Sequence, residues 1–288
     1  MTTTLTDHAI KYSYFDIFDY LDRLELNDTN KMHAKETLED YENYIRSLSE
    51  FSNDALNHFF IKTFYDEIKK SKFIDNPVVY PEEIINSNII FDKINHVAIK
   101  NIHYFSEKNK NHYEYRDIDA WVRKLANEEE TIFWYGANPE DIEQFMNDFI
   151  NFYKSNLFDE NMILKSILVH LIFVRIHPFK DGNSRTTRLL SDIKLLELTN
   201  KAFNNNFSIS PIHLSNSIYR NITKYKNKLA NIYFDNINNP NMGINDFIEY
   251  MLNLFDEEIF YMTTSICKSR NYLLNSSKTD IKIYTKKW

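Results

Sequence analysis

Apolar residues recur every three to four positions along most of the chain, a spacing that predicts helices with one buried face. Before the middle of the chain it predicts four helical stretches, at residues 8–26, 34–48, 56–68 and 82–105. Turn-forming Asp75, Asn76 and Pro77, followed by Pro81, interrupt the pattern. We therefore expect an N-terminal helical extension over residues 1–80, with the main domain after it.

The pattern changes in the centre of the chain. Residues 120–122 and 131–135 form two short runs rich in β-branched and aromatic types, and Gly136 closes the second, which predicts a β-hairpin. The second run consists of Thr131, Ile132, Phe133, Trp134 and Tyr135. An ordinary core strand is the alternative interpretation of this run.

Helical spacing returns after Asn138 and Pro139, which suit an N-cap and a first helical position. Residues 161–176 are apolar on nearly every side, so this helix should be the buried centre of the fold. Within it, His170 is predicted to be a packed, hydrogen-bonded core histidine and not a catalytic partner. Three further helices are predicted at residues 184–198, 214–233 and 245–262. They complete the main domain, residues 81–262, and residues 263–288 form a C-terminal tail.

Polar chemistry is concentrated in residues 177–188, between the buried helix and the next one. Pro178 cannot continue a helix and biases His177 away from the α-helical region. The buried helix should therefore end near Ile176 and present His177 at its edge. Phe179 should return to the core, and a turn over 181–183 should lead into a helix capped by Asn183 or Ser184.

The same run has the residues of a phosphate site. The first turn of a helix offers free N–H groups, which attract anions. Arg185 and Arg188 are three residues apart, so both lie on one helical face and can reach one polyphosphate. Asp181 adds a carboxylate and His177 a titratable imidazole. Each feature alone is commonly structural, but together they indicate a nucleotide-phosphate site.

Composition narrows the alternatives. Three glycines (136, 182 and 243) and six prolines are too few for an all-β chain, and the glycines are too far apart for a GxGxxG or P-loop site. A formal net charge of −7 argues against a nucleic-acid partner bound by a broad basic surface. The single cysteine, Cys267, allows no intrachain disulfide, and no apolar run is long enough to span a membrane. We expect a cytoplasmic protein without a membrane partner; the alternative is a secreted bacterial effector that acts in a host cytosol.

Residues 177–188 resemble the signature of the Fic/Doc family, HxFx(D/E)GN(G/K)RxxR, from which only Ser184 departs, since the family usually has Gly or Lys there. Seven residues stand on motif positions: His177, Phe179, Asp181, Gly182, Asn183, Arg185 and Arg188. Tyr115 and Arg116 resemble the pair with which the family enters its flap. The resemblance covers residues 103–255. It implies a mainly α Fic-type helical bundle with a short β-hairpin flap, here with an N-terminal helical extension.

The resemblance also implies an activity, transfer of AMP from ATP with Mg²⁺ to a Ser, Thr or Tyr hydroxyl of a target protein (AMPylation). In that reaction His177 would be the catalytic base and Asp181 the Mg²⁺ ligand. The flap, residues 131–135, would pair with the backbone of the target. The phosphates would be bound by the backbone N–H groups of Gly182, Asn183 and Ser184, by the Asn183 side chain, and by the side chains of Arg185 and Arg188.

Two other functions remain open. One is a Fic-fold enzyme that uses another nucleotide donor or removes AMP, and the other is a nucleotide-binding or partner-binding protein with a decayed site, of which Ser184 would be a sign. Many relatives carry an inhibitory helix with the pattern (S/T)xxxE(G/N), which this chain lacks. The sequence therefore predicts that no internal carboxylate clamps Arg188, with Glu67 and Glu42 as the competing candidates. A separate inhibitory protein is a further candidate partner.

Overall fold

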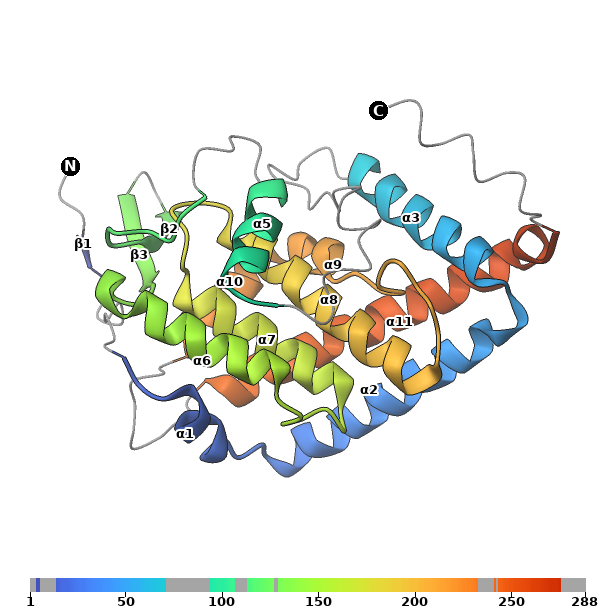
Figure 1. Ribbon diagram of the computed structural model, residues 1–288, viewed down its shortest axis with the longest axis horizontal. Helices are drawn as coiled ribbons and strands as arrows, with labels where there is room; N and C mark the ends of the chain where they lie inside the picture. The colour runs from blue at the N-terminus through green and yellow to red at the C-terminus, as the bar shows by residue number, and fades with distance from the viewer. Residues whose placement is uncertain are drawn as a thin grey trace.

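The computed structural model describes residues 4–5, 14–70, 94–106, 113–126, 129–232, 241 and 243–275. This part of the chain is mainly helical, with one small sheet at one end (Figure 1). The expected domain boundary near residue 77 and the stretch 82–93 lie outside it. The mainly α fold expected from the sequence is thus confirmed.

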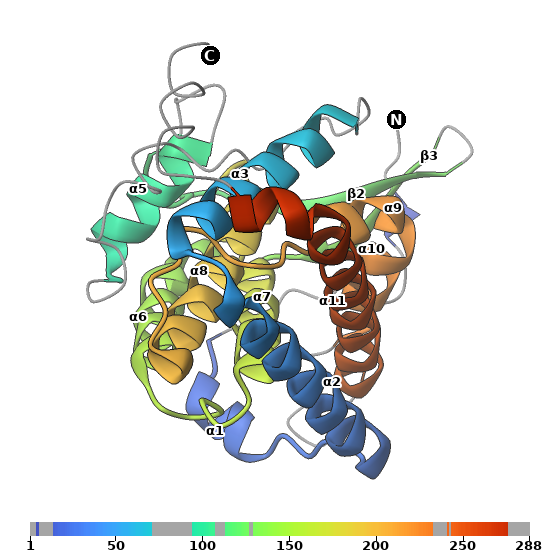
Figure 2. The ribbon, with the colours of Figure 1, turned by 90° about the vertical axis from the view of Figure 1, so that its right-hand side faces the viewer.

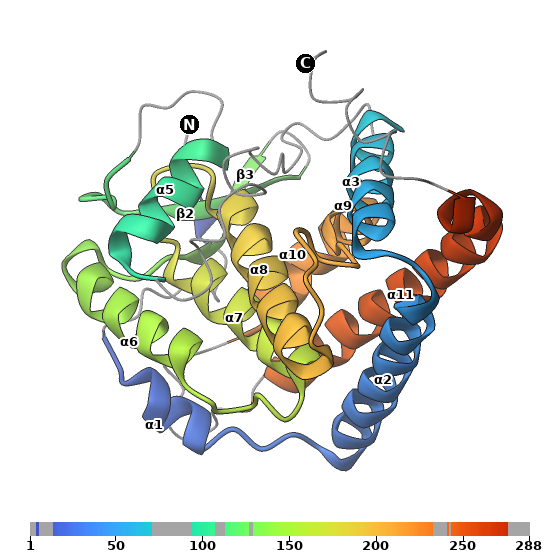
Figure 3. The same ribbon diagram turned by 45° about the vertical axis from the view of Figure 1, so that its right-hand side comes forward.

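Two antiparallel helices form the centre, α7 (Met162–Ile176) and α8 (Asn183–Phe203). Every residue of α7 is buried, which agrees with its apolar sequence. Buried Ser166 and Ser191 join the two helices through their hydroxyl groups, 2.9 Å apart. Around this pair, α6 (Ile142–Lys154) packs on α7 and α5 (His96–Ser106) packs on α8 (Figure 3).

The N-terminal helices cover one side of this centre. They are α1 (Ile17–Asp22), α2 (Asp28–Ser47), the short η1 (Leu48–Glu50) and α3 (Asn53–Lys70). Helix α2 lies beside the long α11 (Ile244–Asn275) (Figure 2). Asp256 of α11 accepts a hydrogen bond from the Thr37 hydroxyl at 2.8 Å, so α2 and α11, which are far apart in the sequence, are packed together.

Several helix boundaries differ from the sequence prediction. Residues 14–16 are not helical, because the Asp16 carboxylate accepts the Phe18 N–H at 2.7 Å and starts α1 at Ile17. Residues 23–27 are not helical either, since α1 ends at Asp22. The helix predicted over 214–233 is divided at Asn221 into α9 (Ser215–Arg220) and α10 (Ile222–Ala230). Helix α11 does not stop at 262 but continues to Asn275, since Ile266 and Leu273 extend its buried face.

The sheet has the strand order β1-β3-β2. Strands β2 (Trp121–Ala126) and β3 (Glu129–Tyr135) pair antiparallel, which confirms the predicted hairpin. The two residues of β1 (Thr4–Leu5) pair parallel to β3 on its other edge. A short 3-10 turn, η2 (Pro139–Asp141), then leads from the hairpin into α6. Among the helices that the structure describes, none combines the length and apolarity that a membrane crossing needs.

Candidate active site

His177 ends α7 as the sequence predicts, with its backbone in the left-handed region (φ 55°, ψ 56°). Its Nδ1 lies 3.2 Å from the carbonyl oxygen of Val174. A carbonyl can only accept, so Nδ1 carries the proton and the neutral ring offers its Nε2 lone pair. Burial lowers the pKa of His177 to about 4, and the charges of Arg116 and Arg175 contribute to the same shift. At neutral pH the imidazole is therefore unprotonated and able to accept a proton.

Arg116 fixes the backbone around His177. Its buried guanidinium donates to the carbonyl oxygens of His177 (2.7 Å), Ile118 (2.8 Å) and Ala137. The Arg116 N–H also donates to the carbonyl of Pro178 at 2.9 Å. The sequence drew attention to Arg116 only as part of the flap entry, and its contact with His177 was missed because the two are 61 residues apart.

Gly136 lets the hairpin approach His177 closely. A Cβ at this position would lie 2.7 Å from Nη2 of Arg116 and 2.9 Å from Cβ of His177. The next residue, Ala137, donates its N–H to the carbonyl of Ile176 at 3.1 Å. The end of β3 and the end of α7 are thus joined at the position of the catalytic histidine of the signature.

Asn183 holds the loop between α7 and α8 closed. Its side-chain oxygen accepts the Phe179 N–H at 2.9 Å, and its side-chain nitrogen donates to the Phe179 carbonyl at 2.7 Å. The Phe179 ring is fully buried and stacks on His103, with ring centroids 3.6 Å apart. These bonds use the side-chain oxygen and one of the two side-chain N–H groups of Asn183, so a place for this side chain in the anion hole stays a prediction.

Helix α8 begins with free donors. Gly182 is its N-cap in the left-handed region (φ 75°) and provides no side-chain cap, so the predicted capping by Asn183 or Ser184 is wrong. Asp181 Oδ1 accepts the Gly182 N–H at 2.6 Å. The N–H groups of Asn183 and Ser184 make no hydrogen bond within the described part of the chain. The positive end of a 21-residue helix is therefore open to an anion.

Arg185 and Arg188 add positive charge to this helix start. Arg185 is buried, with Nη2 4.0 Å from Asp181 Oδ2, and Arg188 Nη1 donates to the Ser184 hydroxyl at 3.4 Å. Burial lowers the pKa of both guanidinium groups, and their mutual repulsion lowers that of Arg185 further. Two cations held together against their own repulsion are stabilised by a polyanion between them.

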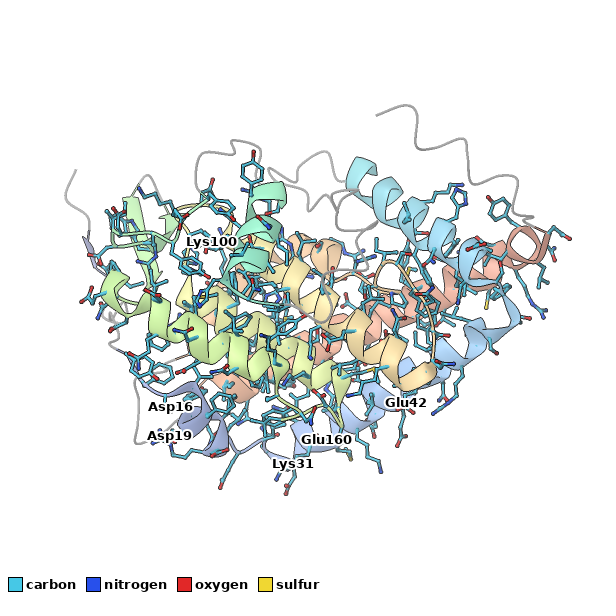
Figure 4. All side chains as sticks on the ribbon, viewed as in Figure 1. Asp16, Asp19, Lys31, Glu42, Lys100 and Glu160 are labelled. Carbon is cyan, nitrogen blue, oxygen red and sulfur yellow. The ribbon has the colours of Figure 1, made fainter. Side chains whose placement is uncertain are left out.

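No carboxylate forms an ion pair with Arg188 in the part of the chain that the structure describes. Glu42 instead pairs with Arg46 on its own helix at 2.7 Å. Lys100 of α5, which packs over the Tyr115 ring, marks the region of the loop. Figure 4 shows Glu42 on α2, well separated from Lys100. The side chain of Glu67 lies outside the described residues, so the absence of a clamp stays a prediction.

Asp181 is the only acidic residue of the loop, and its side chain is 68% exposed. One of its oxygens is bound to Gly182, and the other faces no partner closer than Arg185 within the described residues. No group of three or more metal-binding side chains occurs in that part of the chain. A single carboxylate suits Mg²⁺, which usually takes one or two carboxylates together with water and substrate phosphates.

His170 is not part of this site. It is buried in α7, and its Nε2 lies 2.7 Å from the Tyr225 hydroxyl. Burial lowers the pKa of His170 to about 3, with the charge of Arg188 as a smaller cause. The prediction of a hydrogen-bonded core histidine is confirmed.

The predicted flap is present as backbone. Strand β3 includes Thr131, Ile132, Phe133, Trp134 and Tyr135, although the structure describes the side chain of Tyr135 alone among them. Docking of a target on this strand stays a prediction.

Residues 93–195 match the model of the Fic/DOC family, a range that includes α5, the hairpin and the whole loop between α7 and α8. The fold is similar to a Fic family protein from Desulfovibrio desulfuricans G20, with 13% identity over 84% of this chain and 76% of that one and a TM-score of 0.55. It is also similar to Fic-1 (residues 134–508) from C. elegans, with 14% identity over 84% and 74% and a TM-score of 0.50. Residues 93–195 therefore match the Fic/DOC family, and the fold is similar to that of Fic family proteins.

Proposed function

We propose that this protein transfers AMP from ATP to a Ser, Thr or Tyr hydroxyl of a target protein. The observation that carries the proposal is a neutral His177, with Nδ1 held by Val174 and Nε2 left to accept a proton, in the loop that opens onto the start of α8. Members of this family commonly act on proteins in this way, and the loop contains each group that the reaction needs.

In the proposed reaction the target hydroxyl gives its proton to Nε2 of His177 while its oxygen attacks the α-phosphorus. A new P–O bond forms, the bond from the α-phosphorus to the bridging oxygen breaks, and pyrophosphate leaves. Arg185, Arg188 and the free N–H groups at the start of α8 offset the negative charge of the phosphates.

Asp181 is the residue that would hold Mg²⁺. When bound, the ion would supply charge neutralisation at the phosphate oxygens.

Ser184 does not block the proposed site. Its side chain is exposed, its hydroxyl accepts a hydrogen bond from Arg188, and its N–H is one of the two free donors in the described structure. These features support an active enzyme over a binding protein with a decayed site. The proposed phosphate cradle, made of Arg185, Arg188 and the free N–H groups at the start of α8, would contact only phosphates. The same chemistry could therefore serve another nucleotide donor or the removal of AMP, and the experiment includes those reactions.

The test is transfer of label to proteins of a cell lysate with Mg²⁺. Compared with the same lysate without the protein, ATP labelled at the α-phosphate should give additional labelling of protein, whereas ATP labelled at the γ-phosphate should give none, because that label leaves with pyrophosphate. His177→Ala should abolish the signal, and His58→Ala, on α3 outside the loop, should retain it. α-labelled UTP, GTP and CTP test the donor, and release of AMP from a modified protein tests the reverse reaction. Additional labelling from the γ-phosphate that depends on the protein, or no additional labelling from any α-phosphate, would contradict the proposal.

A further inference from the structure

The edge of β3 that faces away from β2 is already paired within the molecule. Thr4 lies opposite Thr131 and Leu5 opposite Ile132, in a parallel arrangement. Over these two positions β3 is therefore paired on both edges, by β2 on one side and by the N-terminal strand on the other (Figure 1). The N-terminal strand comes from a point 127 residues away in sequence, so it is a separate segment laid onto the hairpin.

This edge leads directly to the loop that carries His177. Strand β3 ends at Tyr135, a Cβ at Gly136 would lie 2.9 Å from Cβ of His177, and Ala137 is hydrogen-bonded to the last carbonyl of α7. An extended segment paired with β3 would therefore run alongside the strand that ends at the proposed base. Because β1 is parallel to β3, its Leu5 end points the same way as the Gly136 end of β3.

An open strand edge pairs with an extended peptide through main-chain hydrogen bonds, so one edge position can hold one segment at a time. We propose that Thr4–Leu5 occupies the docking edge for the protein target, and that a target must displace this strand before transfer. This inference rests on the proposed function, since it assigns the edge to the target of that reaction.

The short length of β1 makes such displacement feasible. A strand of two residues adds few main-chain hydrogen bonds, each of which contributes only modestly in water. Its pairing should slow target modification by roughly 5- to 30-fold, the factor that corresponds to one or two such net interactions. It should leave nucleotide binding unchanged, because the phosphate donors belong to α8 and not to the hairpin.

A double proline substitution tests occupancy and competition together. Thr4→Pro with Leu5→Pro removes both backbone N–H groups of β1, whereas Thr4→Ala with Leu5→Ala keeps them and is the matched control. The proline variant should exchange the amide hydrogens of residues 131–132 faster and label the lysate proteins roughly 5- to 30-fold faster than the alanine variant. Equal exchange and equal labelling in the two variants would overturn the inference.

A reversible cross-link gives the opposite perturbation. Thr4→Cys and Thr131→Cys, in a Cys267→Ser background, place two thiols at register partners on adjacent strands, which is within disulfide reach. The oxidised protein should label lysate proteins at least tenfold more slowly than the reduced protein, with the same dissociation constant for ATP. Failure of the disulfide to form in the folded protein, or equal labelling in both redox states, would overturn the inference.

The two experiments separate this inference from the proposed function. Hydrogen exchange and disulfide formation report whether the strand is paired. If both show pairing, yet neither the reduced protein nor the proline variant transfers α-label, the proposed function is wrong, and the docking role is wrong with it. If transfer occurs and its rate is the same whether β1 is cross-linked, paired or displaced, only the docking role is wrong.

Discussion

Arg116 should be the residue outside the signature on which transfer depends most, and Arg116→Met tests this. Methionine fills a similar volume without donors, so the carbonyl oxygens of His177, Ile118 and Ala137 lose the bonds that Arg116 makes to them. At about 1 to 2 kcal/mol for each of the three buried bonds, the free energy of unfolding should fall by about 3 to 6 kcal/mol. Since folded domains have about 5 to 15 kcal/mol, the variant should remain folded at low temperature.

The effect on catalysis should exceed the effect on stability. His177 sits in the left-handed region, which costs a non-glycine residue about 1 to 2 kcal/mol, and Arg116 binds its carbonyl oxygen. Without that bond the backbone can relax, and a shift of about 1 Å in a catalytic group can cost about 100-fold in rate. The transfer rate should therefore fall by about 100-fold while the dissociation constant for ATP changes little.

The decisive measurement is the pKa of His177 by NMR titration of its ring. The charge of Arg116 lowers this pKa, so Arg116→Met should raise it from about 4, and Arg116→Lys, which keeps the charge but not the fork of donors, should raise it less. Urea unfolding at low temperature reports the stability change separately. If Arg116→Met loses the expected stability but keeps both the pKa of His177 and the rate of transfer, Arg116 is only structural.

Four further predictions concern the same loop. His177→Ala should abolish transfer and leave ATP binding intact, because it removes the base and not the cradle; equal loss of both by calorimetry would make His177 structural. In wild type the acid limb of the kcat/KM profile should have its midpoint below 6.5, toward about 4, since His177 stays neutral until that pH and transfer is lost only as it protonates; a midpoint at or above 6.5 would contradict this. Gly136→Ala should lower transfer at least tenfold, because the new Cβ would lie 2.7 Å from Nη2 of Arg116, and a folded variant with full activity would refute that packing. Glu67→Gly should leave the labelling rate unchanged, whereas a large increase would reveal a carboxylate clamp on Arg188.

The central helices and the break between them could be predicted because their causes are local. Residues 161–176 are apolar on all sides, and Pro178 ends the helix through its own ring and its missing N–H. The positions of His177 and Arg185 follow from their spacing to that break. These parts of the fold needed no knowledge of distant contacts.

The helix ends that were wrong depend on side-chain contacts that apolar spacing does not report. In the first predicted helix, the apolar spacing from residue 8 onward did not reveal that the Asp16 side chain would cap α1 and start it late. At the other end of the chain, Arg270 of α11 binds Glu50 with Nη2 2.7 Å from Oε2, across 220 residues. Periodicity reports which face of a helix is apolar, but the partner that extends or stops the helix lies elsewhere.

Asn183 shows a similar limit within the signature itself. The sequence identifies Asn183 as a residue of the motif. A side-chain amide, however, can bind either a ligand or the backbone of its own loop, and both uses need the same residue type. The structure gives its oxygen and one N–H to Phe179, so this side chain binds its own loop and keeps one N–H that a ligand can use. Side-chain identity alone could not separate these two roles.

Strand β1 was not predictable from its own residues, and the reason bears on its proposed role. Thr4 and Leu5 lie in a short polar stretch without the alternation of a half-buried strand, so nothing local favours pairing. What pairs them is the edge of β3, which accepts main-chain groups. An edge that captures so weak a strand from its own chain should also accept an extended segment of another protein that carries a hydroxyl. Pairing through the main chain, which left no pattern for β1 in the sequence, is therefore also what a docking edge for protein targets requires.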